Sequence, residues 1–224
     1  MEQFVRLKNR IARAAKAANR PEHAVTLLAV SKKQPLQRLE AAIAAGQRRF
    51  GENYMDEALL KMDALNEHAL EWHFIGPIQS NKTRHLAERF DWVQTVDRIK
   101  IVRRLNDQRP AGRAPLNVLL QVNLDAEPQK AGCMPVQLEA LAAAVVAAPN
   151  LRLRGLMAIP APRSDPEDQK KVFAYLKALY DRLAEAHADV DTLSAGMSDD
   201  LEAAIAAGST MVRIGTDLFG ARPD

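Results

Sequence analysis

Short apolar runs alternate with Ala- and Leu-rich helical stretches along the whole chain of 224 residues. Eight of the runs have the length and composition of strands: 26–32, 48–53, 71–76, 92–97, 116–124, 151–159, 192–197 and 211–216. The helical stretches between them include 35–46, 134–149 and 169–187. Strands that alternate with helices indicate a parallel sheet, and eight such units predict a closed (β/α)8 barrel of the TIM type. An open, doubly wound sheet is the alternative.

An extra helix is expected before the first strand, because apolar side chains recur there at helical spacing: Phe4, Leu7, Ile11, Ala14 and Ala18. We expect this helix to pack on the domain and to be ended by Pro21, rather than to act as an organelle transit peptide. The Pro-rich stretches 106–117 and 159–168 fit loops between consecutive units. Residues 1–224 are therefore expected to form a single domain.

The composition argues against several classes of protein. The net charge is only +3, basic residues do not gather in one block, and aromatic residues make up 5%, so nucleic-acid binding is not expected. No apolar run approaches the roughly 18 residues that span a membrane. A single cysteine, Cys133, precludes an internal disulfide and fits a cytoplasmic protein.

Small and hydroxyl-bearing residues follow the last two expected strands. Ser198 comes just before an expected helix, and Gly215 and Thr216 end the eighth strand. The loops after strands seven and eight of a barrel often bind phosphate, because helix N-termini and small residues present backbone N–H groups to an anion. Taken singly, Ser198 could be an ordinary N-cap and Gly215 a turn glycine. Their joint occurrence at these two units favours a phosphate site.

Two lysines, Lys32 and Lys33, end the first expected strand. Side chains alternate between the two faces of a strand, but this does not show which lysine points inward, because barrel strands are buried on both faces. Both could be solvated, or one could form a Schiff base with a phosphorylated aldehyde such as pyridoxal 5′-phosphate (PLP) or a sugar phosphate. Arg213 shares a face with Gly215 and favours PLP, because an arginine can donate to the pyridine nitrogen. An ion-pair role for Arg213 stays open.

These residues lie in segments that closely resemble the pyridoxal phosphate homeostasis proteins (the YggS/PROSC family). That family comprises fold-type III PLP proteins related to the N-terminal barrel domain of alanine racemase. The resemblance runs over nearly the whole chain. It is strongest at LLAVSK (27–32), FGENY (50–54), WHFIGPIQSNK (72–82), LRLRGLMAIP (151–160) and LSAGMSDDLEAAIAAGSTMVRIGTDLFG (193–220).

The resemblance implies a cofactor site built from six residues: Lys32, Asn53, Ser198, Arg213, Gly215 and Thr216. By this resemblance Lys32 would carry the Schiff base, Arg213 would face the pyridine nitrogen and Asn53 would line the cofactor. The other three would hold the phosphate, and Lys33 is not required. No catalytic residue and no metal ligand is assigned.

Other family positions are less defined. Lys130 matches a family lysine in the loop after the fifth strand and could serve as a second, transient acceptor of PLP. His73 and the run 79–82 belong to the family signature, but the sequence alone gives them no role. The chain departs from the common pattern at Ala195 and just after Lys130, which affects only the details of that loop.

The implied function is that of a PLP carrier or buffer in intracellular PLP homeostasis, with an indirect effect on amino-acid metabolism. The alternative is a PLP-dependent, racemase-like enzyme with weak or no activity; a Schiff-base aldolase or sugar-phosphate isomerase is remote. Racemases of this fold add a C-terminal domain with a tyrosine base, whereas this chain ends shortly after Thr216. Among Tyr54, Tyr175 and Tyr180, only Tyr54 is expected near the barrel mouth, so a second base is missing and a non-enzyme is expected. The expected partners are PLP and, transiently, apo PLP-dependent enzymes; the chain is expected to be a monomer.

Overall fold

Eight parallel strands close into a barrel in chain order, with β1 hydrogen-bonded to both β2 and β8. The computed structural model describes residues 2–125, 127, 131–163 and 165–220. The strands are β1 Thr26–Val30, β2 Arg49–Glu52, β3 Glu71–Phe74, β4 Trp92–Val96, β5 Leu116–Gln121, β6 Leu151–Met157, β7 Thr192–Ser194 and β8 Met211–Ile214. The predicted (β/α)8 barrel is confirmed, and the open-sheet alternative is wrong.

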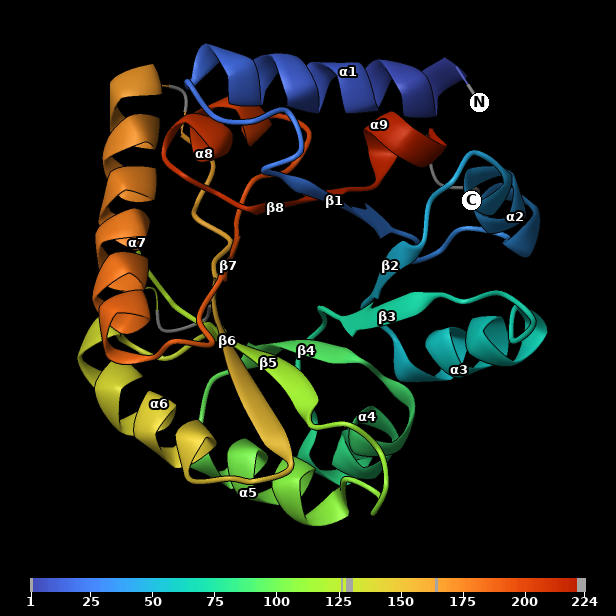
Figure 1. The fold of residues 1–224 in the computed structure, drawn as a ribbon, viewed down its shortest axis with the longest axis vertical. Coiled ribbons are helices and arrows are strands. Elements are labelled where there is room, and N and C mark those ends of the chain that lie inside the picture. Colours follow the sequence, from blue (N-terminus) through green and yellow to red (C-terminus); the bar gives the residue numbers. More distant parts are fainter. Residues whose placement is uncertain (1, 126, 128–130, 164, 221–224) are drawn as a thin grey trace.

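Helices surround the ring of strands (Figure 1). They are α1 Glu2–Ala17, α2 Leu36–Ala44, α3 Met55–Ala64, α4 Thr83–Arg89, α5 Ile99–Gln108, α6 Leu138–Val146, α7 Pro166–Ala186, α8 Leu201–Ala206 and α9 Thr216–Phe219, with short 3-10 turns at Ser80–Lys82 and Pro135–Gln137. In the described part of the chain, no helix combines the length and the apolar composition that crossing a membrane requires.

The extra N-terminal helix α1 packs across α8 and α9, outside the ring of strands (Figure 1). Its buried side chains are Phe4, Leu7, Ile11 and Ala15. The prediction of an amphipathic helix is therefore confirmed, although Ala15 is buried rather than Ala14. The helix ends at Ala17, ahead of Pro21, and Asn19 follows with a φ of 55° that leaves the helical region.

The main hydrophobic core includes residues of every helix from α1 to α9 and lies largely between the strands and the surrounding helices. Two smaller clusters are separate from it: Leu28, Ile75 and Met211 form one, and Trp92, Leu119 and Met157 form the other. Leu28 is paired in register with Arg213 of β8, whose side chain also points inside the barrel. The barrel interior is therefore a mixture of apolar clusters and buried polar groups.

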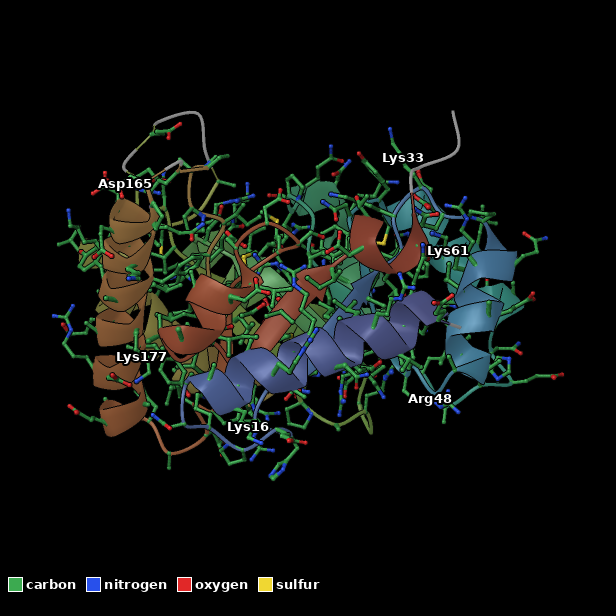
Figure 2. The ribbon with its side chains drawn as sticks, turned by 90° about the horizontal axis from the view of Figure 1, so that it is seen from above. Lys16, Lys33, Arg48, Lys61, Asp165 and Lys177 are labelled. Atoms are coloured by element: carbon green, nitrogen blue, oxygen red, sulfur yellow. The ribbon has the colours of Figure 1, made fainter. Side chains whose placement is uncertain are left out.

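The two ends of the barrel carry different loops. Figure 2 shows Lys33 and Asp165 at the carboxyl ends of the strands, and Lys16 and Arg48 at the opposite end. In barrels of this kind, functional groups gather at the carboxyl ends. The candidate site is found there.

Candidate functional site

A cavity of about 240 Å³ lies at the carboxyl ends of β1, β2 and β8. The residues that line it are Val30, Lys32, Gln34, Asn53, Ile75, Ile159, Met197, Ser198, Asp199, Arg213, Gly215 and Thr216. The structure thus brings together all six residues singled out from the sequence. A second cavity of about 370 Å³ shares Asn53, Ile75, Ile159 and Met197 with the first and extends the space toward β3, β4 and β5.

The two lysines after β1 point to different places. The strand ends at Val30, two residues earlier than expected, and the chain then turns. Lys32 lines the cavity together with Val30. Lys33 is exposed, has a φ of 57°, and places its Nζ 6.0 Å from the ring centroid of Tyr54 outside the cavity. The turn, rather than strand alternation, separates the two side chains.

A buried ionic network anchors this turn to α3. Lys61 Nζ donates to the backbone oxygen of Ser31 at 2.6 Å, to Oε1 of Glu52 at 2.7 Å and to Oε1 of Glu57 at 2.6 Å. Ser31 Oγ also donates to Oε1 of Glu52 at 2.7 Å, and the backbone N–H of Lys33 donates to Oε1 of Glu57 at 2.6 Å. The residues on both sides of the cavity lysine are therefore fixed by one cluster of charges. This cluster could not be predicted from the sequence, because Lys61 is spaced like any helical i,i+4 partner of Glu57.

Arg213 is buried and enters the cavity from β8. Its Nη1 donates to the backbone oxygen of Ser194 at 2.7 Å and to Ser194 Oγ at 2.9 Å, and its Nη2 donates to the backbone oxygen of Ala158 at 2.9 Å. No described carboxylate forms an ion pair with it. Burial lowers the pKa of the guanidinium to about 10, which still leaves it protonated at neutral pH. The charge of Asp200 acts on Arg213 without an ion pair between them, so the positive charge of the guanidinium can also act on a ligand.

Asn53 contributes an unsatisfied acceptor to the same cavity. Its Oδ1 is buried and has no hydrogen-bond partner. A Cβ on Gly76 would lie 2.2 Å from the backbone oxygen of Asn53. The segment after β3 can therefore pack this closely against Asn53 only with glycine at position 76. Buried acceptors without a partner are uncommon in folded proteins, and one that lines a cavity fits a ligand donor.

Ser198, Gly215 and Thr216 form the side of the cavity nearest β7 and β8. Ser198 is not an ordinary N-cap, because α8 begins at Leu201 and its N-cap is Asp200. Gly215 immediately precedes α9, and a Cβ there would lie 3.3 Å from the backbone oxygen of Val30. Two hydroxyl groups and a closely packed glycine suit an anionic group.

Arg10 of α1 joins the two loops that make this anion side. Its Nη2 donates to the backbone oxygen of Ser198 at 2.9 Å and to Oε2 of Glu202 at 2.8 Å. Its Nε donates to Oε1 of Glu202 at 2.6 Å, and its Nη1 donates to Oδ2 of Asp217 at 2.8 Å. The extra N-terminal helix therefore braces the loop after β7 against the loop after β8. Nothing in the sequence distinguishes Arg10 from the other basic residues of α1.

Two further predicted features remain. Lys130 lies outside the described residues. His73 is fully buried inside the barrel, where its ring stacks on Trp92 at 5.1 Å between centroids. Over the described ranges, no group of three or more His, Cys, Asp or Glu side chains is placed to hold a metal ion.

Comparison with known proteins connects this site to a family. The family model for the N-terminal domain of alanine racemase matches residues 5–223. The pyridoxal phosphate homeostasis protein of Pseudomonas aeruginosa is 57% identical over 221 residues, which cover 99% of this chain and 95% of that protein. The protein of the same name from Escherichia coli K12 is 53% identical over 222 residues, covering 98% and 95%.

Solved structures agree with the sequence comparison. PipY of Synechococcus elongatus with PLP bound has a TM-score of 0.81 and 36% identity, covering 94% of this chain and all of that one. An alanine racemase of Clostridium difficile has a TM-score of 0.77 at 14% identity, covering 100% of this chain and 58% of that one. This second likeness is one of fold alone.

Proposed function

The chain belongs to the family of pyridoxal phosphate homeostasis proteins, which carry the alanine racemase N-terminal barrel, and we propose that it binds PLP in the cavity at the carboxyl ends of its strands. Its proposed role is that of an intracellular carrier and buffer of PLP. The observation that carries the proposal is the presence, in one cavity, of the amine of Lys32 and the buried guanidinium of Arg213.

The residues that line the cavity fit the chemical groups of PLP. When bound, PLP supplies a reactive aldehyde on an electron-withdrawing ring. Lys32 is the proposed amine for covalent attachment, and Arg213 the proposed donor to the ring nitrogen. The unpartnered Oδ1 of Asn53 can accept a hydrogen bond from a polar ring substituent. Ser198 and Thr216, with the adjoining glycine, are the proposed phosphate ligands.

We propose binding and release rather than catalysis. Among the described residues that line the cavity there is no Tyr, His or Cys side chain to act as a second base beside Lys32. The carboxylate that does line it, Asp199, adjoins Ser198 at the anion side. Tyr54 is half-exposed beside Lys33, and the other tyrosines lie on α7. Pure protein is therefore expected to show no sustained turnover of L-amino acids.

Replacement of Lys32 by Ala tests the proposed attachment. With added PLP, the unaltered protein is expected to show a visible absorption band and, after borohydride reduction, a covalently held PLP detectable by mass spectrometry. Lys32→Ala is expected to lose both, because the attacking amine is gone. The matched control is Lys33→Ala, which removes the neighbouring lysine outside the cavity and should keep both. A reduced adduct that persists in Lys32→Ala, or disappears in Lys33→Ala, would refute the assignment.

Arg10→Met tests the brace between the two anion-side loops. We expect it to raise the Kd for PLP roughly tenfold, because it removes charge-assisted hydrogen bonds to the loops that hold Ser198 and Thr216. Arg6→Met is the matched control, one turn away on α1, where the arginine pairs with Glu2 at the exposed surface. Titration of both variants with PLP should separate them; equal affinities would show that α1 does not support the site.

Three further parts of the proposal concern the surroundings of this site. Transient contact with apo PLP-dependent enzymes would give the released PLP a destination. Lys130 is the proposed second acceptor, and unaltered PLP transfer by Lys130→Ala would remove that idea. A cytoplasmic monomer stays a prediction, which gel filtration of the purified protein tests for oligomeric state.

A further inference from the structure

A chain of hydrogen bonds runs through the inside of the barrel from the proposed cofactor cavity. It starts at Arg213, whose Nη1 donates to Ser194 Oγ at 2.9 Å. Ser194 Oγ in turn donates to Oε1 of Gln94 at 2.7 Å. The three residues come from β8, β7 and β4, so the chain of hydrogen bonds crosses the inside of the barrel rather than following its wall.

The second half of this chain of hydrogen bonds leads to residues of β3. Gln94 Nε2 lies 2.9 Å from Nδ1 of His73, and the same nitrogen donates to the sulfur of Met211 at an N···S distance of 3.2 Å. His73 Nε2 lies 2.8 Å from Oε1 of Glu71. Four linked residues therefore separate the cavity from a carboxylate at the opposite end of the barrel.

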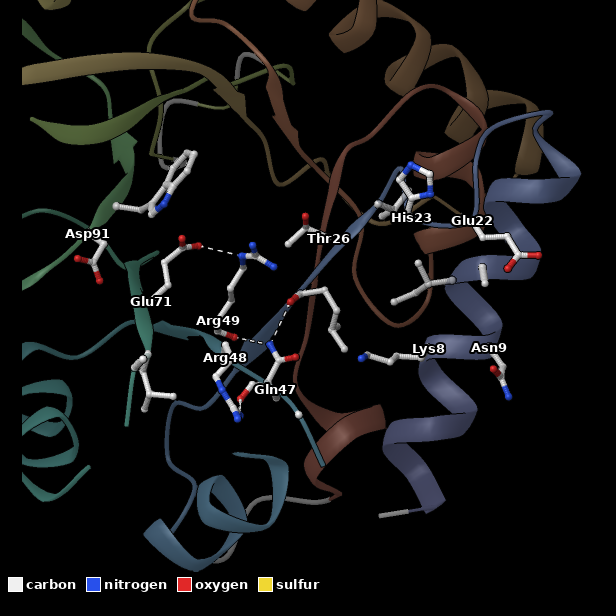
Figure 3. A pocket seen from close by; sticks show the side chains of 18 of the residues that line it. Lys8, Asn9, Glu22, His23, Thr26, Gln47, Arg48, Arg49, Glu71 and Asp91 are labelled. Carbon is white, nitrogen blue, oxygen red and sulfur yellow. Dashed lines mark hydrogen bonds and ion pairs between the residues drawn. The ribbon is translucent and has the colours of Figure 1, made fainter. Parts of the chain in front are cut away.

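The hydrogen-bonded residues from Arg213 to His73 are buried, and each end of the series reaches a cavity or cleft: Arg213 lines the proposed cofactor cavity, and His73 is bonded to Glu71. His73, Gln94 and Ser194 have relative exposures of 0%, and Arg213 of 4%. Glu71, by contrast, lines a wide cleft at the amino ends of the strands, where its carboxylate also pairs with Arg49 (Figure 3). The chain of hydrogen bonds thus connects the proposed cofactor cavity to the cleft at the opposite end of the barrel.

The two end groups determine the direction of every bond between them. An arginine only donates and a carboxylate only accepts, so Ser194 must accept from Arg213 and donate to Gln94. The amide of Gln94 must then donate to Nδ1 of His73, which leaves the proton of His73 on Nε2 and directed at Glu71. The donors and acceptors of these hydrogen bonds therefore have a single self-consistent assignment.

The protonation states agree with that arrangement. Burial lowers the pKa of His73, and the hydrogen bond to Glu71 offsets this only in part, so His73 is neutral at pH 7. Burial acts to raise the pKa of Glu71, but the hydrogen bond from His73 and the charge of Arg49 hold it below its ordinary value. A neutral imidazole and an ionised carboxylate are the forms that the chain requires.

Stability alone does not call for such a chain. The interior of a barrel is ordinarily filled by branched apolar side chains, and buried polar groups are tolerated only when all are satisfied. Here each member is satisfied, and the chain ends on the guanidinium that faces the cavity. The natural place to look for its effect is therefore Arg213.

We propose that Gln94 and His73 are positioning residues, which hold Ser194 Oγ as an acceptor for Arg213 and so fix the direction of its guanidinium toward bound PLP. This rests on the proposed PLP site. Without the hydrogen bonds through Gln94 and His73, Arg213 keeps the backbone oxygens of Ser194 and Ala158 as acceptors, so PLP binding is weakened and not abolished.

The decisive variant is Gln94→Met, which keeps the length of the side chain and removes both links. Its matched control is Gln47→Met. Gln47 is also buried and donates to the backbone oxygens of Leu27 and Arg49, at the amino ends of the strands. Both variants lose hydrogen bonds of a buried glutamine, but only Gln94 is linked to Arg213.

Titration with PLP, followed by absorbance, gives the readout. We expect Gln94→Met to raise the Kd roughly five- to tenfold and to change the position or pH dependence of the visible band, since Ser194 Oγ is then no longer held as an acceptor for Arg213. Gln47→Met is expected to match the unaltered protein in both. If Gln94→Met binds with unaltered Kd and spectrum, the positioning role is wrong while the PLP site stands. If the unaltered protein binds no PLP, both are wrong.

His73→Leu tests whether the effect is transmitted along the chain. We expect it to shift the Kd and the band in the same direction, and to add nothing in the double variant with Gln94→Met. Independent, additive effects would show that His73 acts by another route and would overturn its part of the proposal. Should Gln94→Met not fold, Ser194→Ala breaks the same chain beside Arg213 by removing one oxygen atom, and the same Kd and spectrum decide.

Discussion

Lys61→Met is expected to lower the free energy of unfolding by about 3–5 kcal/mol, the cost of removing one partner from a buried ion pair. The side chains of Lys61 and Glu52 are 6% and 0% exposed, and Oε2 of Glu52 already has no partner. Without Lys61, the hydroxyl of Ser31 would be the one partner left to the Glu52 carboxylate among the described residues. Chemical denaturation at pH 7 measures the loss.

The control for this substitution is Lys170→Met on α7. Lys170 pairs with Glu167 at 2.7 Å, but both side chains are about two-thirds exposed, and such pairs contribute about 0–1 kcal/mol. Adding Glu52→Gln to Lys61→Met should recover part of the loss, because it removes the unpaired charge and keeps an acceptor for Ser31. A loss below about 1 kcal/mol in Lys61→Met would mean that water reaches the cluster.

The deficit of Lys61→Met should also depend on pH. Burial raises the pKa of Glu52 above its ordinary value even though Lys61 opposes this, so loss of Lys61 raises it further. A carboxyl whose pKa is raised by folding stabilises the fold when protonated, and that contribution is lost as the pH rises through the folded pKa. The difference in stability between variant and unaltered protein should therefore shrink as the pH is lowered from 8 toward 5.

The second large effect is expected for Gly155→Ala in β6. Gly155 has a φ of 142°, and a Cβ there would lie 1.9 Å from the backbone oxygen of Thr192, its neighbour on β7. No rotation of a side chain relieves a clash with backbone, so β6 and β7 would have to separate. We expect a loss of more than about 4 kcal/mol, or a fall in Tm of roughly 10 °C or more.

Gly46→Ala tests the cost of backbone strain without a steric clash. Gly46, just beyond α2, also has a positive φ, of 94°, but nothing lies within 4 Å of the added Cβ. Its expected cost is only about 1–2 kcal/mol, the penalty for a left-handed alanine. Thermal unfolding of both variants should show the difference, and similar Tm values would contradict the close contact between β6 and β7.

The order and closure of the strands could be predicted from the sequence, because eight strand-like runs alternate with helical stretches, a pattern typical of a closed parallel barrel. The strand ends were harder to predict. Strand β1 stops at Val30 because Ser31 turns away to donate to Glu52, a contact made by a residue on the next strand. Local sequence contains no trace of that partner, so the lysine that follows could not be assigned to the cavity by alternation alone.

The supports of the site could not be predicted, because their partners are distant in sequence. Gln94 and Ser194 are 100 residues apart, and Arg10 and Glu202 are 192 apart. Each residue on its own is an ordinary polar side chain on a strand or helix. Only the folded chain shows that Gln94 is linked to Arg213 and that Arg10 holds the loop of Ser198.

The brace formed by Arg10 has a consequence for the order of events during synthesis. Arg10 leaves the ribosome early, but its partner Asp217 lies 207 residues later, and β1 must wait for β8 before the barrel can close. Elements that emerge first can begin to fold, whereas contacts this distant form last. A nascent chain would therefore have no complete ligand cavity until β8 and α9 have been made. The small molecule would then bind to a finished barrel and would not help to nucleate it.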